Sequence, residues 1–94
     1  MILKNDEGKE LPEQPDISIY PNPYKFTSNA TLKIKADRNV LVQFYNLLGQ
    51  RISSSYFVPA NQEFPIDVNL LTAGMYIAQF TWNGKTYAKR FIIQ

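Results

Sequence analysis

Apolar and polar residues alternate in short runs along this chain, and turn-forming residues separate the runs. The most regular stretch is 71–93, in which two runs rich in aromatic and β-branched residues flank Asn83 and Gly84. An Asn-Gly pair accepts the positive φ angles of a two-residue type I′ turn, so it predicts a β-hairpin. With Trp82 and Lys85 as the closing pair, one face carries most of the large apolar residues (Tyr76, Ala78, Phe80, Trp82, Tyr87 and Phe91). That face requires a partner sheet, because an isolated hairpin is only marginally stable.

Five shorter runs precede the hairpin, and each has the composition of a strand: 17–20, 30–36, 40–45, 50–58 and 62–68. Prolines end the first run and interrupt the last, which places both at sheet edges. The run 40–45 is the most continuously apolar and is expected to be central, whereas Ser53, Ser54 and Ser55 weaken the fourth run. No stretch of the sequence shows apolar residues repeating with the period of a helix. The count is about seven short antiparallel strands, which predicts an all-β, immunoglobulin-like β-sandwich.

The composition excludes several kinds of chemistry. The chain has 94 residues, 45% of them hydrophobic and 19% charged, which is typical of one small folded domain. It contains neither histidine nor cysteine, and so lacks the commonest general base, the commonest metal ligand and any disulfide. No apolar run approaches the ~20 residues of a membrane-spanning helix.

Charge divides the chain into two parts. Residues 1–16 hold five acids and two lysines, a net charge of −3, whereas residues 17–94 have a net charge of +5. Pro12 and Pro15 interrupt the acidic segment, which shows no periodicity. We expect residues 1–16 to be a linker to an upstream cargo domain. The basic residues that follow are scattered singly, so nucleic acid is not an expected partner.

Candidate catalytic groups are sparse. Glu63 and Asp67 share a predicted strand, which would hold them more than ~10 Å apart. The three serines at 53–55 lack a base to activate them, and the four glycines form no phosphate loop. We therefore expect no enzyme activity, no cofactor and no metal site.

Thirteen aromatic residues leave a second function class open. Aromatic platforms on a β-sandwich can bind carbohydrate, which makes a carbohydrate-binding or adhesive module the alternative. In a small domain such residues more often fill the core. An inert spacer module is a third possibility.

Four segments resemble one known family: 19–23 (IYPNP), 42–52 (VQFYNLLGQRI), 71–76 (LTAGMY) and 89–93 (KRFII). Their order and spacing resemble the type A C-terminal sorting domain of the type IX secretion system of Bacteroidetes, over residues 17–94. Each motif alone is weak, but four in the right order within one module are specific.

The resemblance implies an immunoglobulin-like sandwich at the C-terminus of a secreted cargo protein. Such a domain directs its cargo from the periplasm across the outer membrane to the cell surface or the medium, through the type IX secretion machinery. It also implies removal by a sortase-like peptidase, with the cargo released or joined to anionic lipopolysaccharide. We expect a monomer attached covalently to its cargo.

Carried over residue by residue, the resemblance gives a recognition motif in four pieces: Tyr20, Pro21, Asn22 and Pro23; Gly49; Gly74 and Tyr76; and Lys85, Lys89 and Arg90. The same residues also have structural interpretations. The prolines end an edge strand, the glycines suit turns with positive φ, and Tyr76 suits the core. The three basic residues are the better candidates for direct contact with the machinery.

Overall fold

The four-stranded sheet is organised by the C-terminal hairpin. The computed structural model describes residues 3–4, 10–11, 14–26, 31–68 and 71–94. The hairpin joins β8 (Gly74–Trp82) to β9 (Lys85–Ile93), and β5 (Val40–Asn46) and β6 (Tyr56–Val58) complete the order β6-β5-β8-β9. The three-stranded sheet has the order β3-β4-β7 and consists of β3 (Ile17–Tyr20), β4 (Lys33–Ala36) and β7 (Phe64–Pro65).

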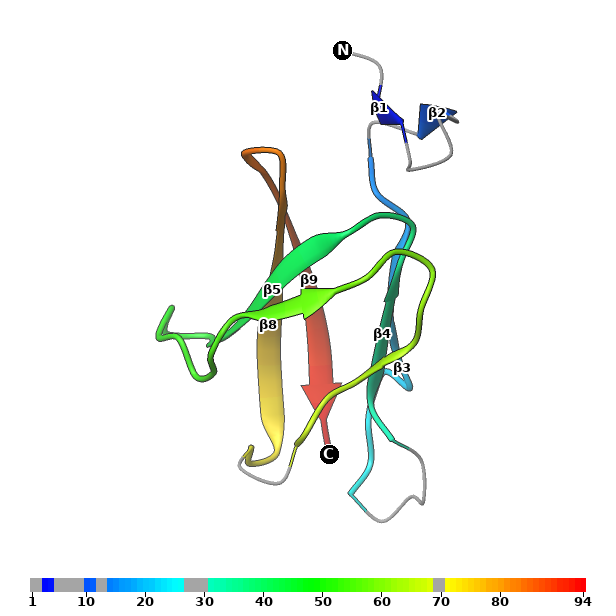
Figure 1. Ribbon diagram of the computed structural model, residues 1–94. Helices are drawn as coiled ribbons and strands as arrows, with labels where there is room; N and C mark the ends of the chain where they lie inside the picture. Colours follow the sequence, from blue (N-terminus) through cyan, green and yellow to red (C-terminus); the bar gives the residue numbers. More distant parts are fainter. Residues whose placement is uncertain (1–2, 5–9, 12–13, 27–30, 69–70) are drawn as a thin grey trace.

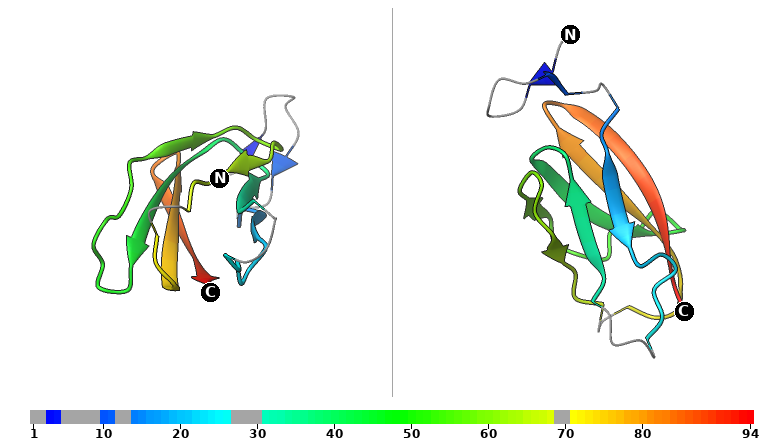
Figure 2. Two further views of the ribbon diagram at one scale, coloured as in Figure 1. Left: turned by 90° about the horizontal axis from the view of Figure 1, so that it is seen from below. Right: turned by 90° about the vertical axis from the view of Figure 1, so that its right-hand side faces the viewer.

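The two sheets face each other as layers of a sandwich, and the strands within each sheet pair antiparallel (Figures 1 and 2). The first, second and fifth of these seven strands form one sheet, and the fourth, third, sixth and seventh form the other. This is an immunoglobulin-like arrangement, so the predicted fold class is confirmed. The described residues contain no helix, and therefore none that could cross a membrane.

The hairpin has the predicted register. Trp82 pairs with Lys85 and Tyr76 with Phe91, and every intermediate pair also agrees. Asn83 and Gly84 have φ angles of 46° and 74°, as a type I′ turn requires. A two-residue turn leaves no slack between its strands, so the sequence of the turn alone determines which residues pair.

The earlier strands lie within the predicted runs, but three of them are shorter than predicted. The strand predicted over 62–68 is limited to Phe64–Pro65, because Pro65 cannot continue the pairing, and the strand predicted over 30–36 begins at Lys33. β3 and β7 lie at the edges of their sheet and β5 is central, as expected. The predicted strand 50–58 is wrong over most of its length, because only Tyr56–Val58 is a strand and Arg51 forms an isolated bridge with Tyr45. One serine between them uses its hydroxyl locally: Ser53 Oγ donates to Ser54 O at 3.0 Å. Such bonds compete with strand pairing.

The core lies between the sheets and takes alternate residues from β3, β4, β5, β8 and β9, together with Val58 of β6. Its buried apolar residues include Ile17, Ile19, Leu32, Ile34, Val40, Val42, Phe44, Val58, Tyr76, Ala78, Phe80, Trp82, Phe91 and Ile93. Phe91 is the hub of its aromatic part, with ring centroids 5.6 Å from both Phe44 and Tyr76. The three-stranded sheet therefore covers the apolar face of the hairpin and is the partner sheet that this face was expected to need.

Part of the segment predicted to be a linker also pairs. β1 (Leu3–Lys4) and β2 (Glu10–Leu11) form a two-residue antiparallel ladder, and the other residues of 1–13 lie outside the described part of the chain. The sandwich begins near Pro15, which is buried, and the Asp37 amide donates to Asp16 O at 3.0 Å. The domain boundary at residue 16 stays a prediction. The predicted start of the next strand at Ala30 also lies outside the described residues.

Candidate recognition site

The last third of β9 brings together segments that are about 70 residues apart in the chain. The Asn22 side chain lies against the free edge of β9: its Nδ2 donates to Arg90 O at 3.3 Å, and its Oδ1 accepts from the Ile92 amide at 3.0 Å. Asn22 thus satisfies two main-chain groups that a further strand would otherwise pair. The peptide bonds before Pro21 and Pro23 are both cis.

Tyr24 continues this contact with its own main chain. Its amide donates to Ile92 O at 2.7 Å, and its carbonyl accepts from the Gln94 amide at 2.7 Å, in a short parallel bridge beside Ile93. The Phe26 amide donates to Gln94 O at 3.1 Å. Because the Tyr24 ring is buried, the segment from Asn22 to Phe26 is anchored along the end of β9 and links the two sheets.

Gly74 and Tyr76 hold the other side of the same strand end. Gly74 pairs with Ile93 and Tyr76 with Phe91. The Tyr76 ring is buried and stacks on Phe91 at an interplanar angle of 26°, and its hydroxyl donates to Thr72 O at 2.7 Å. Gly74 has a φ of 157°, which residues with a Cβ rarely adopt. The Gly-x-Tyr motif therefore shapes the start of β8 and packs the core beneath the end of β9.

Gly49 belongs to a turn that adjoins this end of the sheet. It has a φ of 82°, as predicted, and its amide donates to Asn46 O at 3.0 Å. Asn46 pairs with Tyr76 across the strands, and its Oδ1 accepts from the amides of Leu48 and Gln50, each at 3.0 Å. Gly49 and Asn46 together close the loop that leaves β5 beside Tyr76.

Tyr20 points to a different surface from its neighbour Asn22. Its hydroxyl donates to Glu63 Oε2 at 2.6 Å on the three-stranded sheet, and Lys33 Nζ lies 3.5 Å from the same oxygen. The hydrogen bond to Glu63 raises the pKa of Tyr20. That same bond, followed by the charge of Lys33, lowers the pKa of Glu63. Tyr20 therefore ties β3 to the chain before β7.

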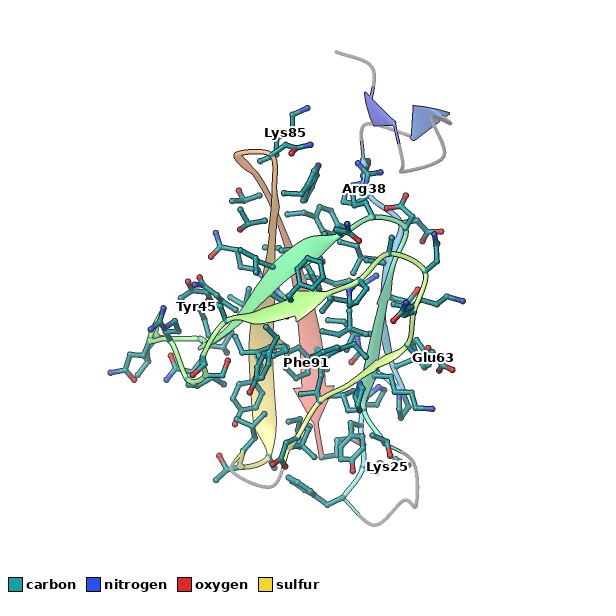
Figure 3. All side chains as sticks on the ribbon, in the orientation of Figure 1. Lys25, Arg38, Tyr45, Glu63, Lys85 and Phe91 are labelled. Carbon is teal, nitrogen blue, oxygen red and sulfur yellow. The ribbon has the colours of Figure 1, made fainter. Side chains whose placement is uncertain are left out.

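The three basic residues occupy three different environments. Lys85 lies at the hairpin turn, eight residues and roughly 26 Å along the strand from Ile93 (Figure 3). Lys89 shares the inner face of β9 with Phe91 and donates from Nζ to Ile17 O at 2.8 Å, across to β3. Arg90 alone is exposed on the outer face. The structure does not bring these three charges into one patch.

Most aromatic rings are accounted for by the core. Trp82 is only 8% exposed, and the Arg38 guanidinium lies 5.4 Å from its ring centroid. Tyr24, Tyr76, Phe44, Phe80 and Phe91 are also buried. The exposed rings of Phe26 and Phe57 belong to different parts of the structure and do not form one platform.

Sequence reasoning placed Asn22 in the motif but missed how it acts, and it missed Tyr24 and Asn46 altogether. The role of Asn46 could have been predicted, because an asparagine three residues before a glycine is typical of a turn in which the side chain accepts hydrogen bonds from the main chain of that turn. Tyr24 had no such signal, because its contacts with residues 92 and 94 are made by the main chain.

Comparison with known protein families adds one finding. The family model for the secretion system C-terminal sorting domain matches residues 18–94. The comparisons with curated proteins and with solved structures each found no match.

Proposed function

Because this chain belongs to the family of secretion system C-terminal sorting domains, which act in type IX secretion, we propose that the folded end of β9 is the part of the signal that the export machinery reads. The domain is a sorting signal for export toward the cell surface or the medium, and its family is non-catalytic. The observation that carries the proposal is the convergence of distant motif segments on one strand end.

The contacts of the motif residues support a conformational signal over a linear one. Asn22 acts on β9 through Arg90 O and the Ile92 amide, whereas Gly74 and Tyr76 act on it through pairing and stacking. None of these contacts would survive in an extended peptide, because the Asn22 bonds join segments about 70 residues apart and the Gly74 and Tyr76 contacts need the folded hairpin. The machinery would therefore recognise the surface that these residues hold in place.

The direct test is transplantation. The full 94-residue chain is fused to the C-terminus of a reporter with a periplasmic signal peptide and expressed in a host that has a type IX system. We expect the reporter at the cell surface or in the medium, and in the periplasm of a matched host whose type IX system is inactivated. A reporter that stays periplasmic in both hosts would contradict the proposal.

Removal of the domain is a separate part of the proposal. A sortase-like peptidase would act on the acidic segment before β3, after passage through the periplasm. The mass of the exported reporter tests this. A loss of roughly 80 residues is expected, and an exported reporter of full mass would show that removal is not part of the process.

A carbohydrate-binding role is less well supported, because Trp82 and five other aromatic residues are buried in the core and three more pack against it. The same fusion tests it by polysaccharide pull-down, in which we expect no binding above that of the reporter alone. The cargo would be attached at the N-terminal side, and we keep the monomer as our expectation.

A further inference from the structure

The outer face of the four-stranded sheet carries three of the six exposed large hydrophobic side chains of the described residues. Six large hydrophobic side chains are exposed there and elsewhere in that part of the chain. Three of them point outward from this sheet: Phe57 is 55% exposed, Leu41 48% and Met75 37%. Leu47 and Leu48 lie in the turn after β5, and Phe26 is the sixth. The outward residues of the three-stranded sheet are instead mainly polar (Ser18, Tyr20, Lys33, Lys35 and Pro65).

One row of this face has cations at both ends. Arg51, Tyr45, Ile77 and Arg90 lie opposite one another across the sheet. Three strand spacings separate the two arginines, roughly 14 Å. Both arginines are exposed, and neither forms an ion pair with another described residue. The row therefore presents an apolar centre between two charges that are available to a partner.

No acidic side chain among residues 14–94 lies on this face. Asp16, Asp37, Glu63 and Asp67 all belong to the three-stranded sheet or to the segments beside it. Figure 3 shows Tyr45 and Glu63 on opposite sides of the molecule. The face is therefore cationic as well as apolar, whereas the opposite face mixes both charges.

Three polar side chains near the middle of the face, those of Tyr45, Gln43 and Ser55, already have partners. Tyr45 donates from its hydroxyl to Gln43 Oε1 at 2.7 Å, and Gln43 donates from Nε2 to Ser55 Oγ at 2.8 Å. Covering this chain of bonds would not leave those groups unsatisfied, so they add little to the desolvation cost of docking.

We propose that the outer face of β6-β5-β8-β9 docks a folded protein of the export apparatus, one that presents carboxylates on either side of an apolar surface. This inference rests on the proposed function and names the partner chemistry of the same signal. Aromatic residues, methionine and arginine are the types enriched at protein interfaces, and they are the types found here. A second copy of this chain fits poorly, because two such faces would oppose arginine with arginine.

The test uses the reporter fusion with two pairs of substitutions. Arg51→Glu with Arg90→Glu reverses the charge of the row, and Leu41→Ser with Phe57→Ser removes apolar surface. We expect each pair to reduce export about tenfold or more, as loss of a hot spot does. Lys35→Glu on the opposite sheet is the charge control, and Leu41→Met with Phe57→Tyr is the apolar control. Both controls are expected to change export less than twofold, and thermal unfolding of the purified chains checks that all variants fold.

A photo-crosslinking residue at Ala88, which is exposed on this face, gives a readout that needs no destabilising change. During export it should form a discrete crosslink to one outer-membrane protein. That crosslink should disappear with Arg51→Glu and Arg90→Glu, and the same probe at Lys35 should give none. If the wild-type fusion is exported and both face variants are exported equally well, the inference fails while the proposed function stands. If the wild-type fusion stays periplasmic, the proposed function fails, and the crosslinking pattern in that compartment still decides the inference.

Two further measurements test whether a membrane surface or a second copy of this chain occupies the face instead. Arginine-dependent sedimentation of the 94-residue chain with phosphatidylglycerol or lipopolysaccharide vesicles would assign the face to a membrane surface and overturn the inference. Concentration-dependent dimerisation that Leu41→Ser and Phe57→Ser abolish would assign it to a second copy, with the same consequence. We expect neither.

Discussion

Tyr76 offers the clearest separation of a structural role from a contact role. It is the tyrosine of the Gly-x-Tyr motif, yet only 7% of it is exposed. If the motif acts through the fold, substitutions at Tyr76 must lower stability first and export only as a consequence. If the motif is a contact, export must fail while stability holds.

The two parts of the side chain predict two magnitudes. Tyr76→Phe removes the hydroxyl that donates to Thr72 O at 2.7 Å, which should cost about 0.5–1.5 kcal/mol. Tyr76→Ala also removes the ring stacked on Phe91, and the loss of a buried aromatic ring costs about 3–5 kcal/mol. A chain of 94 residues is stable by only about 5–14 kcal/mol in total. The alanine variant should therefore lose a large fraction of its stability, and the phenylalanine variant a small one.

Thermal unfolding of the purified chain, followed by circular dichroism, measures both changes. At about 4–8 °C per kcal/mol for a domain of this size, Tyr76→Phe should lower Tm by roughly 2–12 °C and Tyr76→Ala by at least about 12 °C. Thr72→Ala is the matched control, because the acceptor is the main-chain carbonyl. Its hydroxyl lies 3.4 Å from that of Tyr76, so we expect a change within about 0.5 kcal/mol.

Export is then measured with the reporter fusion at a temperature below both transitions. We expect Tyr76→Phe to be exported almost as wild type, and Tyr76→Ala to be exported in proportion to its folded fraction. A Tyr76→Ala chain with an unchanged Tm would refute the burial argument. A fully folded Tyr76→Ala chain that is not exported would show that the tyrosine is itself a contact.

Three more predictions follow from the described contacts. Asn22→Ala leaves the Ile92 amide without its acceptor and should cost about 1–2 kcal/mol in urea unfolding; an unchanged midpoint would mean that water replaces the side chain fully. Burial alone would raise the pKa of Asp37, but its hydrogen bonds from Arg38 and its neighbours hold the pKa below the ordinary 3.8. Stability from this pair is therefore present above about pH 4 and lost as the pH falls through the lowered value, so the deficit of Asp37→Asn, about 3 kcal/mol at neutral pH, should shrink in acid. A deficit that grows in acid would reverse the sign of the argument. Lys89→Met removes a charge that points inward from an edge strand, a feature that discourages edge-to-edge pairing, so sedimentation velocity should show more self-association than for wild type. Equal self-association of the variant and the wild type would mean that Lys89 only donates to Ile17 O and does not protect the edge strand.

The hairpin and the edge strands could be predicted because their rules are local. Asn83 and Gly84 select one turn, and that turn determines nine pairs of residues. Pro65 excludes a central strand wherever it occurs. Each of these inferences needs only neighbours in sequence, and each is confirmed.

The recognition site could be predicted only in part, because its contacts join residues about 70 positions apart. Asn22 reads as a turn residue, and nothing in its neighbourhood shows that its amide will bond the far end of the chain. Tyr24 uses its main chain, which every residue has. The family resemblance supplied the residues of the motif, but their geometry depends on how the two sheets pack.

The basic strand shows a different kind of error. Strict alternation along β9 puts Lys85 and Lys89 on the same face as Phe91, and that face is the inner one. Expecting all three cations to be available for direct contact gave charge more weight than periodicity. The alternation was the better guide, since Lys89 reaches across to Ile17 and only Arg90 remains on the outer face.

If the outer face of the four-stranded sheet is the docking surface we propose, motif residues and contact residues are largely different sets in this domain. Asn22, Gly74 and Tyr76 hold the end of β9 from both sides, so their identity is constrained by the fold. The outer face near Arg90 needs only apolar and cationic character at appropriate places, which many side chains can supply. A contact surface of that kind leaves no short motif in the sequence. It follows that substitutions in the motif should change export in step with stability, whereas substitutions on the outer face should change export at constant stability. A plot of export against Tm therefore separates the two groups. Residues whose substitution lowers export without lowering Tm are the ones that the machinery contacts.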